Sequence, residues 1–477
     1  MAGIGFALRR LSRQETLTSV LAAGGHAAVI AAGPWLFTIA SLGAISISVE
    51  HAAGLETLAT FRAVIIYAFA ASLVLTAPVT MVATRLVADA LWAKRPDTVR
   101  PLLFAAFALA TAVVIAGVLV LSLYFRLDAA LAIAFASSAL TVALIWVALG
   151  FCGAVRDYGA VTAAFLVGLF IAVLGATGAA YAGLGAPGMA AGFSAGLMVT
   201  FLGLAVRVMA TFPQPLTDPQ PGMAALLGGF TTYRTLAIGA AAGTAAVWVD
   251  KWVFWFSPVG ESVKGGLVHA PLYDSAMFIA SLVIIPSLAS FVAKLETDFF
   301  DRYQRYYGSI KQHGTIGQIE DARERLSAHT LDTLVLITIA QVGMCAVLIM
   351  TTPILVSVLG LQFRQIAILR YGALAAVFQF IFIASTSFLL FFDRRWLYLA
   401  LQCLFFALNL ALTMLTVRLG QDYYGVGYFA ACLISSFAAY IAATSTFTNL
   451  NFLTFLGNNP SIVPSSTGFK RPWWDLR

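Results

Sequence analysis

Repeated apolar segments, each long enough to cross a lipid bilayer, constrain the fold of this chain more than any other feature. A transmembrane helix requires about 20 consecutive, mostly apolar residues, and twelve such segments follow one another, separated by short polar breaks. They lie near residues 17–48, 59–84, 101–124, 129–153, 159–183, 188–211, 229–256, 270–293, 331–357, 365–391, 396–417 and 425–450. Because only 10% of the residues are charged, a water-soluble domain is excluded. The sequence predicts an all-α integral membrane protein with about 12 transmembrane helices.

The distribution of Lys and Arg predicts how the helices are oriented, because these residues avoid short translocated loops. If both termini are cytoplasmic, only seven of the 28 basic residues lie outside or in the outer half of a span. These seven are Arg62, Arg126, Lys251, Lys264, Arg364, Arg370 and Arg418. The reverse orientation would reverse this bias, so we expect both termini in the cytoplasm. The net charge of +7 reflects this asymmetry, and we expect no binding to nucleic acid.

A proline-rich segment divides the chain near its middle. The stretch "TFPQPLTDPQPG" carries four of the sixteen prolines, and such a composition interrupts a helix. We therefore predict an N-terminal six-helix lobe (1–212), a cytoplasmic linker (213–228), a C-terminal six-helix lobe (229–452) and a cytoplasmic tail (453–477). A weak repeat, a proline followed by a base and an acid, supports two matching halves. Its members are Pro78, Arg85 and Asp89 in the first half and Pro286, Lys294 and Asp298 in the second.

The stretch "VWVDKWVFWF" places two charged residues, Asp250 and Lys251, inside a segment that otherwise resembles a membrane-spanning helix. On a helix, Trp248, Trp252 and Trp255 form one stripe, and Asp250 points away from it. A Trp stripe of this kind is typical of an aromatic belt at the lipid headgroups, and Lys251 at its edge would extend outward. The pattern therefore predicts that Asp250 points into the helix bundle.

The face that carries Asp250 also carries Gly239, Gly243 and Ala246, small residues that permit close helix packing in a bilayer. One interpretation is that Asp250 forms an ion pair or hydrogen bond that fixes this packing. A second is that it lines a water-filled cavity and contacts a substrate or a coupling ion, because acids inside the membrane are costly. A simple position at the membrane interface is the third.

Four further polar residues are candidates for a substrate path. Asp274 and Arg370, near the starts of the eighth and tenth spans, either line a cavity together with Asp250 or contact headgroups at the membrane edge. Gln379 and Asn409 lie deeper in their spans. Neutral amides at such depth either bridge two helices or bind a ligand.

Residues 294–330 form a cytoplasmic segment too long for a simple turn. Its aromatic residues Phe299, Tyr303, Tyr306 and Tyr307 have helical spacing, which predicts an amphipathic extension of the eighth span. This extension would either lie on the membrane surface or dock a cytoplasmic partner.

Motifs of soluble enzymes are lacking in the sequence. The five histidines form no HExxH or other close metal-binding spacing, and no GxSxG, GxxxxGK[ST] or GxGxxG motif occurs. The four cysteines show no CxxC pairing. We expect a transporter without catalytic residues, a bound metal or a cofactor.

Several long blocks of the sequence resemble the PelG family, inner-membrane proteins of Pel exopolysaccharide systems. The blocks are "AGIGFALRRL", "AGPW", "DKWVFWFSP", "APLYDSAMFIASLVIIP" and "ETDFFDRYQRYY". The resemblance implies a MATE-like and MurJ-like flippase architecture, in which two six-helix lobes surround a central cavity. It also implies export of a growing, cationic, amino-sugar-rich polymer across the bacterial inner membrane for a biofilm matrix.

The partners implied by this resemblance are a cytoplasmic glycosyltransferase and the membrane subunits of a Pel-type synthase complex, including a cyclic-di-GMP receptor. The polysaccharide and the lipid bilayer complete the expected partners. Asp250 and Asp274 occupy positions of the matching blocks, and their negative charge suits a polymer with free amines.

Two other functions remain open from sequence. An ion-coupled flippase for small molecules or lipid-linked oligosaccharides would use the same fold, and a non-transporting subunit of a membrane synthase would share the partners. For polymer export, we expect a channel driven by synthesis, because alternating access suits one small cargo per cycle.

Overall fold

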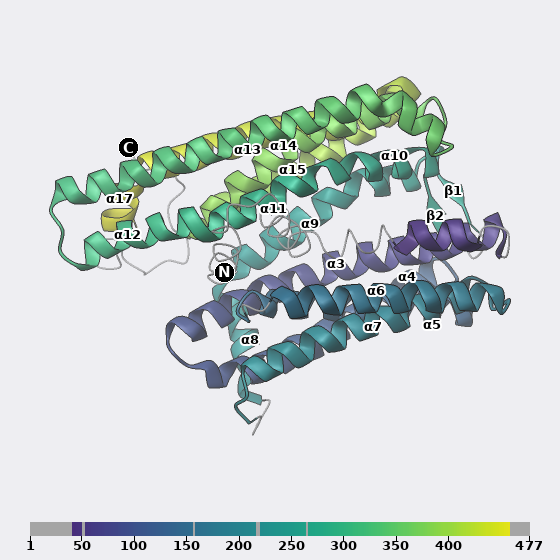
Figure 1. Ribbon diagram of the computed structural model, residues 1–477, viewed down its shortest axis with the longest axis horizontal. Coiled ribbons are helices and arrows are strands. Elements are labelled where there is room, and N and C mark those ends of the chain that lie inside the picture. The colour runs from purple at the N-terminus through teal and green to yellow at the C-terminus, as the bar shows by residue number, and fades with distance from the viewer. Residues whose placement is uncertain (1–40, 50–52, 156–157, 216–219, 264–265, 458–477) are drawn as a thin grey trace.

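The computed structural model describes residues 41–49, 53–155, 158–215, 220–263 and 266–457. This part of the chain is almost entirely helical, and its long helices run roughly parallel in two groups (Figure 1). Apolar side chains cover these helices nearly all round, and polar breaks with Gly or Pro connect them. The prediction of an all-α membrane protein is confirmed.

The N-terminal lobe, coloured purple to teal in Figure 1, contains five long helices in its described part. These are α3 (Leu55–Trp92), α4 (Val99–Tyr124), α5 (Ala129–Cys152), α6 (Tyr158–Tyr181) and α7 (Gly185–Thr211). The short 3-10 turn η1 (Pro96–Thr98) precedes α4. Residues 41–49 are also helical and are the only described part of the first predicted span.

The C-terminal lobe begins with α9 (Arg234–Trp255) and the hairpin of β1 (Glu261–Ser262) and β2 (Val268–His269). A nearly continuous helix follows: α10 (Pro271–Ser281), η2 (Leu282–Ile284), α11 (Ile285–Lys294), the π-helical turn η3 (Leu295–Phe299) and α12 (Phe300–Lys311). The remaining elements are α13 (Ile316–Val358), α14 (Gln365–Phe391), α15 (Arg395–Leu419), η4 (Gln421–Tyr423), α16 (Val426–Thr448), α17 (Leu450–Phe452) and η5 (Leu453–Gly457).

The predicted spans agree closely with these helices. Ten helical segments of the described chain are long and apolar enough to cross a membrane. Helix α9, with 22 residues, is an additional span in our interpretation, and it carries Asp250 and Lys251 within its last turns. Each predicted span from 59–84 onward therefore coincides with a helix.

The two lobes repeat the same packing. In the N-terminal lobe, α3 packs against α5, and α7 packs against both α5 and α6. In the C-terminal lobe, α10 packs against α14, and α16 packs against both α14 and α15. The weak sequence repeat has a structural counterpart as well, because Arg85–Asp89 (3.7 Å) and Lys294–Asp298 (3.2 Å) form ion pairs of the same spacing.

Glycines bring α6 and α7 into backbone contact. A Cβ atom on Gly192 would lie 2.4 Å from the carbonyl of Gly175, and one on Gly196 would lie 2.4 Å from the carbonyl oxygen of Gly168. Such close approach is open only to residues without a side chain. The packing role of the glycines in α7 is thereby established.

The predicted linker 213–228 is only partly a linker. Helix α8 (Gln220–Thr232) occupies its second half and packs against α4 and α3. Pro221 lies in the first turn of α8, where proline is tolerated because the missing N–H has no helical partner. In this proline-rich segment Pro221 therefore belongs to the start of a helix, where the composition predicts an irregular linker.

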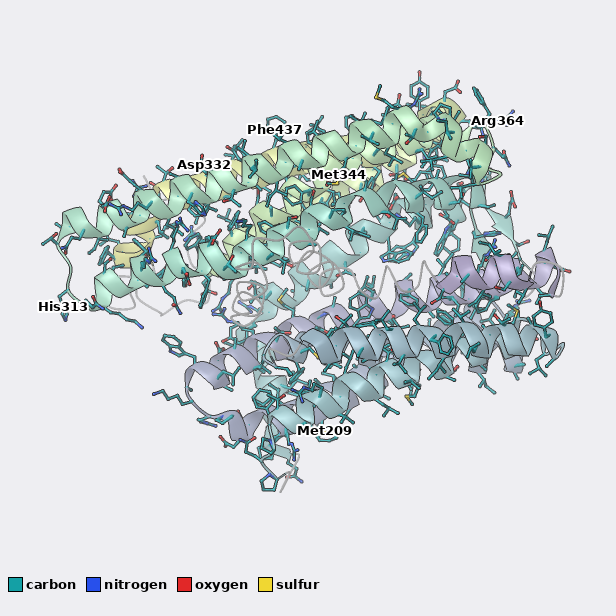
Figure 2. The ribbon with its side chains drawn as sticks, in the orientation of Figure 1. Met209, His313, Asp332, Met344, Arg364 and Phe437 are labelled. Carbon is teal, nitrogen blue, oxygen red and sulfur yellow. The ribbon has the colours of Figure 1, made fainter. Side chains whose placement is uncertain are left out.

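The loops gather at two ends of the molecule, which Figure 2 marks with Arg364 at one and His313 at the other. We call the first the hairpin end, because it contains the β1–β2 hairpin and the loops near residues 125–128, 359–364 and 420–425. The opposite end contains the loops near residues 93–98, 312–315 and 392–394.

Candidate functional site

Asp250 lies in the interior of the C-terminal lobe, as predicted, with no exposed surface. Its carboxylate accepts a hydrogen bond from the Tyr273 hydroxyl (2.8 Å) and contacts Lys251 Nζ at 3.0 and 3.2 Å. The two residues and Tyr273 thus form a closed network between α9 and α10. Because the network satisfies a buried charge, it fixes the two helices relative to each other.

Small residues allow α9 to reach this position. Gly239 and Gly243 face Tyr398 and Gln402 of α15, and a Cβ atom at either glycine would overlap these side chains. Asn409 of α15 donates its amide N–H to the carbonyl oxygen of Ala246 at 2.8 Å. The small-residue stripe predicted for this helix is therefore its packing face against α15.

Lys251 does not extend outward, so that prediction is wrong. Its side chain is 17% exposed, and Nζ donates to the carbonyl oxygen of Val247 (3.1 Å) as well as to Asp250. The ammonium group also lies 6.0 Å from the Trp248 ring and 5.6 Å from the Tyr428 ring. A carboxylate, a carbonyl and two aromatic faces at one point attract a cation more strongly than distant headgroups do.

The predicted aromatic belt on α9 is also wrong. Trp248 and Trp255 are 4% and 2% exposed, and Trp252 is half-buried. The reason is the place of α9 in the molecule, where α3, α10 and α15 cover several of its faces. A Trp stripe read from sequence does not distinguish a lipid interface from a contact with another helix.

Asp274 lies next to Tyr273 and binds Trp255 of α9. We call Asp250, Lys251, Trp255, Tyr273 and Asp274 the cluster. Asp274 Oδ2 accepts hydrogen bonds from Trp255 Nε1 (2.8 Å) and from the backbone N–H of Ala270 (3.0 Å). The other oxygen, Oδ1, is buried and has no hydrogen-bond partner among the described residues. Since Tyr273 binds Asp250, consecutive residues of α10 contact both parts of the cluster.

Trp255 also connects the two lobes. Its ring stacks on Tyr67 of α3, with centroids 4.5 Å apart and planes inclined by 24°. The Tyr67 hydroxyl donates to the carbonyl oxygen of Val268 in β2 at 2.8 Å. Sequence analysis missed Tyr67, because a single tyrosine in a long apolar helix carries no distinguishing pattern.

The other predicted path residues lie apart from this cluster. Arg370 is exposed on α14, and a charged lining shared with Asp250 and Asp274 stays a prediction for this residue. Its position near the start of the helix fits the alternative of an edge charge. Gln379 is half-buried on α14, and Asn409 bridges α15 to α9.

The aromatic residues of the predicted insert do form a helical extension of the eighth span, but they face the protein. Phe299 and Tyr306 are 4% and 0% exposed, whereas Tyr303 and Tyr307 are half-buried. Phe299 packs on Phe388 of α14, with centroids 5.3 Å apart. A docking surface made of these rings is therefore wrong for Phe299 and Tyr306, because packing on neighbouring helices already covers them.

A comparison with family models decides the family. The model described as "PelG: Putative exopolysaccharide Exporter (EPS-E)" matches residues 1–455. The chain belongs to the PelG family. A comparison with curated proteins found no match.

Solved structures similar to this PelG family member are MATE transporters. "Crystal structure of MATE in the bent conformation" aligns with TM-score 0.63 and 16% identity, covering 90% of this chain and 95% of that one. An inward-facing MATE transporter aligns with TM-score 0.62 and 13% identity, covering 87% and 95%. An outward-facing MATE transporter aligns with TM-score 0.60 and 16% identity, covering 89% of this chain and 96% of that one. The MATE-like fold is thereby confirmed. Membership of an exporter family and the ten long apolar helices of the described chain make the protein a multi-pass membrane transporter.

In this PelG family member the two lobes contact each other at both ends. At the hairpin end the contact is aromatic, through Tyr67 and Trp255. At the opposite end it is ionic, because Arg85 of α3 lies 3.7 Å from Asp393 in the loop before α15. Tyr233, which precedes α9, donates a hydrogen bond to Asp89 of α3 and lies under the guanidinium of Arg395.

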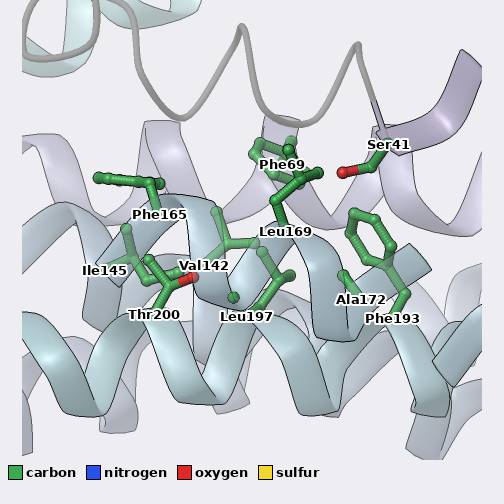
Figure 3. Close-up of a pocket in the computed structure, with 11 residues that line it drawn as sticks. Ser41, Phe69, Val142, Ile145, Phe165, Leu169, Ala172, Phe193, Leu197 and Thr200 are labelled. Atoms are coloured by element: carbon green, nitrogen blue, oxygen red, sulfur yellow. The ribbon is translucent and has the colours of Figure 1, made fainter. Parts of the chain in front are cut away.

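Figure 3 shows a pocket inside the N-terminal lobe of the PelG family member, between α3, α5, α6 and α7. Apolar side chains dominate its lining, including Phe69, Val142, Phe165 and Leu197. Its volume of about 20 Å³ has room for roughly one water molecule, which excludes this pocket as a closed binding site for a sugar. Among the described residues, no group of three His, Cys, Asp or Glu side chains is placed to hold a metal ion.

Proposed function

We propose that this protein moves a growing, Pel-like, cationic amino-sugar polymer from the cytoplasm to the periplasm across the bacterial inner membrane. The observation that carries the proposal is the match of an exopolysaccharide-exporter family model over residues 1–455. The two-lobed MATE-like fold supports it, because this architecture places a transport path between the lobes.

The chemistry of the cluster on α9 and α10 supports a cationic cargo. Asp250 and Asp274 carry two carboxylates, and Lys251 supplies one ammonium group. Lys251 neutralises Asp250, whereas no Lys or Arg pairs with Asp274 among the described residues, so an ammonium group of the cargo would supply the counterion of an ionised Asp274. Asp274 is the better candidate for direct contact with the polymer, since Asp250 is saturated by Lys251 and Tyr273.

The distribution of basic residues supports a cytoplasmic position for the opposite end. Loops and helix ends there carry Lys94, Arg95, Arg302, Arg305, Lys311, Arg325, Arg394 and Arg395. The hairpin end then faces the periplasm, and both termini lie in the cytoplasm.

The partners in this proposal are a cytoplasmic glycosyltransferase and synthase subunits that include a cyclic-di-GMP receptor. The α12–α13 hairpin provides a surface that a soluble partner can contact. Helix α13 has 43 residues and is about 64 Å long at 1.5 Å per residue, about twice the thickness of the hydrocarbon core. We expect this partner to dock on the exposed side chains near Gln304, Arg305 and Lys311, and not on the buried aromatic rings.

The first test measures surface polysaccharide in a deletion strain that carries wild-type protein, Asp274→Asn or Asp250→Asn at matched membrane levels. We expect Asp274→Asn to reduce secretion at least tenfold, because it removes the charge near the lobe contact. Asp422→Asn, an exposed acid at the hairpin end, is the matched control and should secrete normally. Normal secretion by both cluster variants would remove the cluster from the polymer path.

A second test concerns the source of energy. If synthesis drives the polymer through the protein, export stops when the glycosyltransferase is inactivated by mutation. The measurement is transport of preformed polymer into sealed vesicles that contain the complex. Continued movement of preformed polymer would contradict a synthesis-driven channel and favour an ion-coupled flippase.

A further inference from the structure

We propose that Tyr67 and Trp255 form an aromatic gate between the lobes, and that the separated rings of this gate bind a pyranose ring of the polymer. The inference rests on the proposed function and adds to it the residues that contact sugar. It starts from the stack of these two rings, 4.5 Å apart, which join α3 of one lobe to α9 of the other.

Each ring is held in the closed position by one hydrogen bond to the C-terminal lobe. The Tyr67 hydroxyl donates to the carbonyl oxygen of Val268 at 2.8 Å, and Trp255 Nε1 donates to Asp274 Oδ2 at 2.8 Å. Both rings are almost fully buried, at 5% and 2% exposed. When the lobes separate, the bond to Val268 breaks, whereas Trp255 and Asp274 remain together on the same lobe.

Other rings extend the closed contact toward the hairpin end. Phe125, at the end of α4, stacks on Phe256, at the end of α9, with centroids 6.3 Å apart. Phe125 also meets Tyr67 edge to face at 5.4 Å. The stack of Phe125 on Phe256 joins side chains of two separate lobes, and the contact of Phe125 with Tyr67 lies within the N-terminal lobe. By contrast, the contact of α6 with α7 joins backbones within one lobe. Side-chain contacts of this kind can separate without disturbing either lobe.

The groups exposed by separation match the chemistry of a sugar. A pyranose has a face of C–H groups, which an aromatic ring can cover, and a rim of polar groups that require hydrogen-bond partners. Asp274 Oδ1 is buried and without a hydrogen-bond partner among the described residues, so it is available to a hydroxyl or ammonium group. A carboxylate beside two flat rings therefore selects a cationic hexosamine over an acidic sugar.

Cross-linking tests whether the lobes must separate here. Phe125→Cys and Phe256→Cys are combined in a background with the exposed Cys403 replaced by Ser, which leaves Tyr67 and Trp255 intact. A short, reducible bis-thiosulfonate linker should reduce export at least tenfold, and a reductant should restore it. The matched control joins Phe107 and Phe201, whose rings lie 5.2 Å apart within one lobe, and should export normally when linked. Normal export by the linked cross-lobe pair would overturn the gate.

Binding tests the contact with sugar. Titration calorimetry of the purified protein with a glucosamine tetramer should show at least tenfold weaker binding for Tyr67→Leu and Trp255→Leu. Tyr67→Phe, which keeps the ring, should bind within about threefold of wild type. If wild type exports polysaccharide and the leucine variants bind the tetramer normally, the gate proposal fails while the function stands. If wild type exports no polysaccharide, the proposed function fails.

Discussion

The ion pair of Asp250 and Lys251 shows how one residue determines the role of its neighbour. The acid is completely buried, so its counterion has to come from the protein, and the adjacent lysine supplies it at 3.0 Å. Removal of one member of such a pair leaves an uncompensated charge, which is far more costly than replacing both. The pair therefore stabilises the C-terminal lobe only as a unit.

We expect Lys251→Met to destabilise the protein by about 3–5 kcal/mol, the usual cost of breaking a buried pair. The double variant Lys251→Met with Asp250→Asn should recover most of this loss. Thermal unfolding in detergent measures both, and Lys94→Met, at an exposed position, should change stability by less than about 0.5 kcal/mol. A double variant as unstable as the single one would show that the ion pair is not what holds Asp250.

Sequence predicted part of this cluster and missed the rest for a physical reason. Helical periodicity placed Asp250 on an inward face and the small residues beside it, because both follow from 100° per residue. Periodicity says nothing about which helix covers that face. Trp255 and Tyr67 were therefore missed as partners, since their contact joins residues 188 positions apart that only the lobe arrangement brings together.

At the scale of elements, glycine determines how closely α6 and α7 pack. The overlap at Gly192 is with backbone atoms of Gly175, which cannot turn aside as a side chain can. We expect Gly192→Ala to cost about 1–3 kcal/mol through overpacking. Gly178→Ala is the matched control, because a Cβ atom there meets nothing within 4 Å. Unfolding by denaturant in mild detergent compares them, and equal stabilities would show that α6 and α7 can move apart freely.

The β1–β2 hairpin should respond to pH through His269. Burial lowers the pKa of this imidazole below its usual value of about 6.5, partly offset by nearby Glu261. The folded hairpin thus binds the proton less readily than the unfolded chain. Its stability is complete above about pH 6.5 and falls as the pH drops toward the lower folded pKa. After correction for the intrinsic rate of exchange, which falls as the pH drops, the protection of residues 261–263 and 266–269 against hydrogen exchange should be lower at pH 5.5 than at pH 7.5. His269→Gln should remove this difference.

The elements themselves were predictable because the bilayer imposes their length. Every span from 59–84 onward coincides with a helix, since a backbone in lipid has to satisfy its own hydrogen bonds. The linker was less predictable, because proline is found both where a helix is interrupted and in the first turn of a helix, and Pro221 lies in the first turn of α8. Similarly, the spacing of Phe299 and Tyr306 predicted a helix correctly but left open that α14 and the segment after α16 cover its apolar face.

At the scale of the whole molecule, the two contacts between the lobes differ in kind. The hairpin end is closed by buried aromatic rings. Charged side chains make the contacts at the opposite end: Arg85 pairs with Asp393, with side chains 36% and 42% exposed, Asp89 accepts a hydrogen bond from Tyr233, and Lys311 lies 4.7 Å from the Trp92 ring. Exposed ion pairs contribute about 0–1 kcal/mol and weaken with salt, whereas aromatic stacking in a buried site does not depend on ionic strength. The opposite end should therefore open more readily.

This difference predicts a selective response to ionic strength. Spin labels at Lys94 and Gln312 report the distance between the lobes at the opposite end, and labels at Arg126 and Arg364 report it at the hairpin end. Raising NaCl from about 50 to about 500 mM shortens the Debye length from about 14 to about 4 Å. We expect longer and broader distances for the first pair only, and Arg85→Ala should produce the same change at low salt. An equal response at both ends would mean that the lobes separate as rigid bodies without a preferred side. A response at the opposite end alone would show that its ionic contacts hold that end closed and that it can open while the aromatic contact at the hairpin end stays intact.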